Sequence, residues 1–154
     1  MTEFSGTGHG MAQRYVRIFR FVVNFRLWHP ALSLEAISTE FGTVLKLKDD
    51  FVPGRGIKRG MPPLTYWSSE SASGEDEHFI AVIRRFVELL ESKASFLEDL
   101  ATKGGQSELF VGWFQSRRGG GVVVPSDLLG RLGKLRVDLS LDVYGTGEEP
   151  DDLN

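Results

Sequence analysis

Hydrophobic residues recur at intervals of three or four positions between residues 75 and 103, which is the spacing of one face of an α-helix. Ser73 and Asp76 predict a capping box at its start, and the glycine pair at 104–105 predicts its end. Residues 92–93 leave open a break into two shorter helices. These hydrophobic residues form a wide apolar stripe that other elements must cover, so we expect a long central helix packed on a sheet. The stripe consists of Phe79, Ile83, Phe86, Leu90, Ala94, Leu97 and Ala101.

Two segments at opposite ends of the chain carry the clearest strand patterns. Residues 15–25 place apolar side chains on both faces, as expected of a central strand. Residues 135–144 alternate between apolar and polar side chains, which predicts one buried face and one face in water. Shorter apolar runs predict further strands at residues 43–47, 64–68, 108–115 and 122–124.

Two short helices complete the predicted elements. Ser33 predicts the N-cap of one that ends at Gly42, and Pro125 predicts the first turn of another that ends at Gly133. Residues 69–74 are predicted to be a polar linker. Together these elements predict an α+β fold with two layers. An antiparallel or mixed sheet of about five to six strands packs against one long central helix and two short helices.

Length and composition bound the class of protein. A chain of 154 residues usually forms one domain, which we place at residues 14–144 between a glycine-rich tail at 1–13 and an acidic tail at 145–154, both predicted to be disordered. The absence of cysteine excludes disulfides, thiol catalysis and cysteine-ligated metals. No apolar run is long enough to span a membrane and the first residues lack a signal-peptide pattern, so we expect a cytoplasmic protein.

The residue types that catalysis and metal binding need form no recognisable pattern. The three histidines, His9, His29 and His78, have no one-turn spacing, so the sequence predicts no metal site. There is no nucleophile elbow, and the carboxylates occupy predicted solvated positions instead of an apolar frame that would raise a pKa. We therefore predict no catalytic residue, no cofactor and no metal.

Basic residues gather at two glycine-rich places, the predicted loop at residues 46–60 and the predicted turn at residues 116–121. Guanidinium groups beside backbone amides can hold an anion or a phosphate backbone. Charge that keeps a loop tip soluble is the more common reason for such residues, and the net charge of −3 argues against a dedicated nucleic-acid binder. The candidate anion- or partner-binding residues are Arg55, Lys58, Arg59, Arg117 and Arg118.

Several local features occur in the same order in a known family. They are a phenylalanine-rich first strand, a short helix ending at Phe41-Gly42, a glycine-bearing loop before Tyr66-Trp67-Ser68, Leu89-Leu90 in the long helix, Gly120-Gly121 before a Pro-Ser-Asp-Leu-Leu helix, and a Leu-Asp-Val-Tyr ending. Over residues 14–144 the chain resembles the bacterial family known only as domain of unknown function 4279. That family has no assigned activity, so the resemblance implies no catalytic residue.

Three functions are consistent with the sequence. The first is a non-catalytic protein-interaction domain with a protein partner, by analogy with small acidic domains such as toxin-neutralising immunity proteins. The second is binding of an anion or nucleic acid through the loop at 46–60, with an affinity that falls with salt. The third is an unrecognised hydrolase or transferase, in which acidic side chains, His29 or Ser68 would converge between the long helix and that loop.

Overall fold

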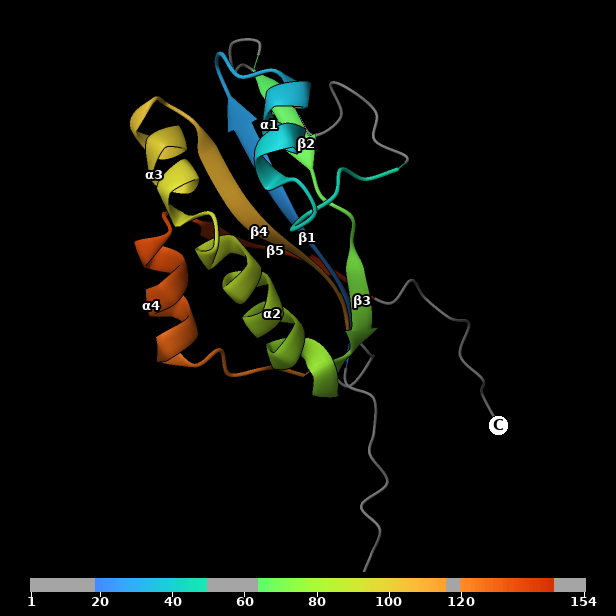
Figure 1. Ribbon diagram of the computed structural model, residues 1–154. Helices are drawn as coiled ribbons and strands as arrows, with labels where there is room; N and C mark the ends of the chain where they lie inside the picture. Colours follow the sequence, from blue (N-terminus) through green and yellow to red (C-terminus); the bar gives the residue numbers. More distant parts are fainter. Residues whose placement is uncertain (1–18, 50–63, 116–119, 146–154) are drawn as a thin grey trace, which may run out of the picture.

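A mixed sheet covered on one face by helices forms the body of the protein (Figure 1). The structure is a computed structural model that describes residues 19–49, 64–115 and 120–145. This arrangement confirms the predicted α+β fold. In chain order the elements are β1 (Phe19–His29), α1 (Leu34–Phe41), β2 (Thr65–Ser68), β3 (Ala72–Glu75), the 3-10 turn η1 (Asp76–His78), α2 (Phe79–Glu91), α3 (Ala94–Thr102), β4 (Gln106–Gln115), α4 (Ser126–Lys134) and β5 (Asp138–Tyr144).

Strand β1 is central in the sheet, as its two apolar faces predicted. One edge pairs antiparallel with β4, from Phe19 opposite Gln115 to Trp28 opposite Gln106. The other edge pairs with β2 and then with β3. β5 pairs in parallel with β4 and ends the sheet, whose order is β2-β1-β4-β5 with β3 also on β1. One edge of β5 therefore has no strand partner among the described residues.

The core lies between the sheet and the helices, where the odd-numbered side chains of β1 and β4 meet α2. Phe19 stacks on Trp113 with ring centroids 3.8 Å apart, and Phe79 at the start of α2 packs edge-on against both rings. Farther along β1, Phe25 packs edge-on against Phe41 of α1. All three tryptophans are buried. These aromatic contacts fix the helical layer on the sheet.

The segment predicted as one long helix is divided at residues 92–93, the break that the sequence left open. Ser92 Oγ donates to the Leu89 carbonyl at 2.6 Å, and the Lys93 N–H donates to the Leu90 carbonyl at 2.9 Å, so a tight turn ends α2. The break lets α3 change direction while Leu97 stays buried in the same core. The buried residues of the predicted stripe are therefore divided between two helices that pack against the same core.

The structure confirms one of the two predicted ends of this helical segment. The N-cap at Ser73 is wrong, because Ser73 pairs with Val22 in β3 and α2 begins only after η1. The glycine stop is confirmed: Gly104 has a φ of 89°, and the Gly105 N–H donates to the Leu100 carbonyl at 2.8 Å. The predicted short helix after Ser33 is confirmed as well, since its Oγ accepts the Ala36 N–H at 3.1 Å.

Four short predictions are wrong. Residues 43–47 form only one bridge, from Leu47 to Ser69, and residues 122–124 form no strand, because β5 takes the place beside β4. The predicted linker at 69–74 contains β3, since β1 is long enough to pair with two short strands in succession. The predicted helix stop Gly133 lies inside α4, and the chain turns instead through Arg136, with a φ of 57°.

Candidate functional site

The end strand β5 exposes the side of its alternating pattern that the sequence predicted to be buried. Leu139, Leu141 and Val143 lie in register with Leu109, Val111 and Trp113 of β4, so they face the helical layer. Their exposed fractions are 37%, 51% and 55%, whereas the three β4 side chains are buried. The predicted burial is therefore wrong for β5, because the helices extend over β4 but leave the end of the sheet uncovered.

A groove runs along this uncovered side of β5. Its volume is about 330 Å³, and the first turn of α2, the inner face of β4 and the connection before α4 form its walls. Trp113 closes one wall, and its buried Nε1–H has no hydrogen-bond acceptor among the residues that the structure describes. The apolar side chains around the groove are Phe79, Val111, Trp113, Val122, Val124, Leu139, Leu141 and Val143.

Exposed aromatic rings continue the same edge on the opposite face of the sheet. Tyr144 of β5 stacks on Phe114 of β4, with centroids 4.9 Å apart and an interplanar angle of 16°. The guanidinium group of Arg20 lies over the Phe114 ring, 5.9 Å from its centroid. Gly112 sits beside both rings, and a side chain there would contact them. Large hydrophobic side chains in the described ranges are exposed only from residue 114 onward: Phe114, Val123, Leu129, Leu139, Leu141, Val143 and Tyr144.

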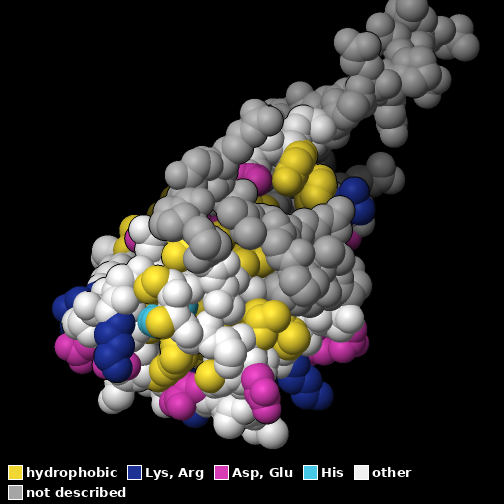
Figure 2. Space-filling model, turned by 90° about the horizontal axis from the view of Figure 1, so that it is seen from above, with side chains coloured by type: hydrophobic (Ala, Val, Ile, Leu, Met, Phe, Trp, Pro, Cys, Tyr) yellow, Lys and Arg dark blue, Asp and Glu magenta, His cyan; other side chains and the backbone are white. Residues whose placement is uncertain are grey.

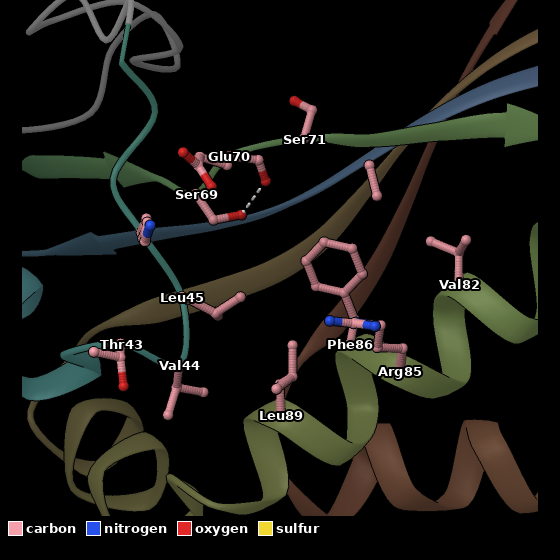
Figure 3. A pocket seen from close by; sticks show the side chains of 12 residues that line it. Thr43, Val44, Leu45, Ser69, Glu70, Ser71, Val82, Arg85, Phe86 and Leu89 are labelled. Atoms are coloured by element: carbon pink, nitrogen blue, oxygen red, sulfur yellow. Dashed lines mark hydrogen bonds between the residues drawn. The ribbon is translucent and has the colours of Figure 1, made fainter.

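A second hollow of about 250 Å³ lies between α2, the segment after α1 and the β2–β3 connection (Figure 3). Val44, Val82 and Leu89 belong to its apolar lining, while Lys46 and Arg85 bring positive charge to it from opposite sides. No described ion pair involves either cation, and both side chains are exposed. This hollow can accept a ligand with an apolar body and an anionic group.

The predicted anion-binding residues Arg55, Lys58, Arg59, Arg117 and Arg118 lie outside the described residues. Of the basic residues just before them, Lys46 lines the second hollow and Lys48 is half-buried, its N–H donating to the Ser68 carbonyl at 3.0 Å. On the face in Figure 2, acidic and basic side chains are interspersed, so the described part of that face has no field of one sign.

His29 and Ser68, which a hydrolase or transferase would use, both have structural contacts. His29 Nδ1 accepts the N–H groups of Ala31 and Leu32 at 3.0 and 2.8 Å, and burial lowers its pKa, with the charge of Lys103 acting in the same direction. Ser68 Oγ donates to the Ser69 carbonyl at 3.4 Å. Within the described ranges no three histidine or acidic side chains are grouped closely enough to hold a metal ion.

Fold and surface together define a two-layer α+β domain with an exposed apolar end strand. In a comparison with protein-family models, residues 19–146 match the family described as a domain of unknown function, DUF4279. The chain belongs to this family. No curated protein and no solved structure shows significant similarity to it. In the part of the chain that the structure describes, no helix is long and apolar enough to span a membrane.

The sequence contained the residues of this edge but not its exposure. The alternation at residues 135–144 indicated a strand. A strand whose apolar side is covered and one whose apolar side is exposed can have the same alternating sequence. The alternation therefore carried no signal that distinguished an exposed apolar side from a buried one.

Proposed function

We propose that this protein is a non-catalytic protein-interaction domain that binds an extended polypeptide segment along β5. The observation that supports the proposal is the exposure of Leu139, Leu141 and Val143 beside a strand edge that pairs with no other strand in the described ranges. Edge strands of soluble proteins are normally short or protected by charge, proline or bulges, since an apolar edge invites another strand to pair. Contiguous exposed apolar surface is typical of an interaction site.

The geometry fits addition of a strand. The free edge of β5 can exchange backbone hydrogen bonds with an extended segment, while the adjoining groove accepts the apolar side chains of every second residue. A partner with alternating apolar and polar residues therefore matches both the edge and the groove.

Site-specific photo-crosslinking in the native cell tests the proposal. A photoreactive amino acid at position 141 should capture a defined polypeptide, whereas the same amino acid at position 129 should not. Leu129 is the matched control, because its exposed fraction of 47% is close to the 51% of Leu141 but it lies on α4. Absence of a specific product at position 141, or identical products at both positions, would refute an interaction through β5.

A second function, binding of an amphipathic anion, is favoured by Lys46 and Arg85 at the hollow beside α2. The fluorescent probe anilinonaphthalene sulfonate has the required apolar body and negative group. We expect its binding to weaken about tenfold in Lys46→Ala/Arg85→Ala and with added salt. Lys134→Ala, which removes an exposed charge on α4, is the control. Binding that is insensitive to both cations would exclude this site.

A further inference from the structure

We infer that the segment bound by β5 is β5 of a second copy of this chain, paired antiparallel across a two-fold axis at Leu141. The inference rests on the function proposed above. Such pairing would join two five-stranded sheets into one continuous sheet with closed symmetry. Two properties of β5 carry the inference: its charges are compatible with itself in one register, and its uncovered apolar side chains meet in that same register.

Charge selects the register. With the axis at Leu141, Ser140 lies opposite Asp142 of the second copy and Asp138 lies opposite Tyr144 of the second copy. Moving the axis to Ser140 would place Asp138 opposite Asp142, and moving it to Asp142 would place that carboxylate opposite itself. Like charges directly opposite each other on paired strands are destabilising. Only the axis at Leu141 separates the carboxylates while keeping all seven residues paired.

The apolar side chains then face one another. Leu141 meets Leu141 of the second copy, and Leu139 meets Val143 of the second copy, on the face of the sheet that carries the helices. A two-fold axis perpendicular to the sheet keeps the helices of both copies on this face, so the two uncovered strips become one. An axis between two residues would instead place each leucine opposite a polar or acidic side chain, which loses this burial.

β5 also lacks most of the usual protection against such pairing, since its two charged residues, Asp138 and Asp142, lie on the face away from the helices. Among its seven residues there is no proline, glycine or basic side chain, and no charged residue points toward the helical layer. A strand of seven residues is about 23 Å long, so the contact is smaller than the roughly 800 Å² per partner of a standard interface. We therefore expect a reversible dimer with a dissociation constant in the micromolar range.

Sedimentation velocity of the full chain, from about 1 to 500 µM, tests the inference. Leu141→Asp places two carboxylates at the axis and should weaken the dimer at least about 100-fold. Leu129→Asp introduces the same charge at a similarly exposed leucine on α4 and should leave the dimer unchanged. Ser140→Lys adds two Lys–Asp142 pairs across the axis and should tighten the dimer about 2- to 20-fold, with the gain lost at high salt.

The gain from Ser140→Lys is the readout that depends on the register, and this variant alters a half-buried serine without touching the core. A wild-type chain that stays monomeric, or a dimer that Leu141→Asp does not weaken, would overturn the inference. If the crosslinker at position 141 captures a different polypeptide while the chain sediments as a monomer, the second copy is excluded and the interaction function stands. If position 141 gives no specific crosslink and the chain sediments as a monomer, both the interaction function and the dimer are refuted.

Discussion

The indole of Trp113 lies parallel to the ring of Phe19, with centroids 3.8 Å apart and 22° between the ring planes. The two rings belong to neighbouring strands, and Phe79 from α2 touches both of them edge-on at 5.8 Å. Trp113 thus joins the sheet to the helical layer, and it also forms a wall of the groove beside β5. The same side chain links stability of the body to the shape of the candidate surface.

Trp113→Ala should destabilise the protein by about 3–5 kcal/mol, because it removes a buried aromatic side chain and leaves a cavity between two packed rings. Urea denaturation followed by far-UV circular dichroism measures the change. Leu129→Ala, at an exposed position on α4, should change the unfolding free energy by less than about 0.5 kcal/mol. Equal effects of the two substitutions would contradict the packing described for Trp113.

Ser69→Ala should destabilise the protein by about 1–3 kcal/mol. Ser69 is buried between β2 and β3, and its Oγ accepts the Phe25 N–H at 2.9 Å. The same Oγ donates to the Glu70 carbonyl at 2.8 Å (Figure 3). Alanine would leave the Phe25 N–H in the core without an acceptor. Ser73→Ala, at an exposed position of β3, is the control, and thermal unfolding is a sufficient measurement. A Ser69 variant as stable as the wild type would show that water replaces the hydroxyl.

Two glycine substitutions should change the free energy of unfolding in opposite directions. Gly130→Ala replaces a glycine inside α4 where a side chain would meet nothing within 4 Å, so we expect stabilisation by about 0.5–1 kcal/mol. Gly105→Ala places a Cβ 2.8 Å from the Leu100 carbonyl oxygen and closer still to the Leu100 Cδ2, so we expect a loss of more than about 1 kcal/mol. Chemical denaturation of both variants checks the pair, and two changes of the same sign would contradict the close contact at the end of α3.

His29 should make stability depend on pH. Burial lowers the pKa of its imidazole below the ordinary value of 6.5, with Lys103 adding to this effect and Asp99 opposing it. The unfolded chain therefore takes up this proton first as the pH falls. Stability should be complete above about 6.5, decline below it, and stop declining once the pH is below the folded-state pKa.

Thermal unfolding between about pH 8 and 5 measures this dependence. Asparagine at position 29 can accept the N–H groups of Ala31 and Leu32 without titrating, so His29→Asn should flatten the profile. His78→Gln, which replaces an exposed histidine at the start of the helical layer, is the matched control. An unchanged profile in His29→Asn would assign the pH dependence to other groups.

The predictable part of the fold came from features that depend only on neighbours in the chain. Ser33 and Gly42 bound α1 because a side-chain cap and a positive φ act within a few residues. The stripe from Phe79 to Ala101 identified the helical layer because a helix places residues three and four apart on one side. The candidate site could be anticipated only as a strand at residues 135–144.

Local sequence patterns were sufficient to indicate most helices and strands and which of their sides are apolar. Three features became visible only in the folded chain: residues 72–75 pair with β1, residues 122–124 do not pair, and β5 lies beside β4 at the end of the sheet. Strand partners and sheet order depend on segments far apart in the chain. For that reason the same alternating pattern that indicated a buried face leaves Leu141 half in water.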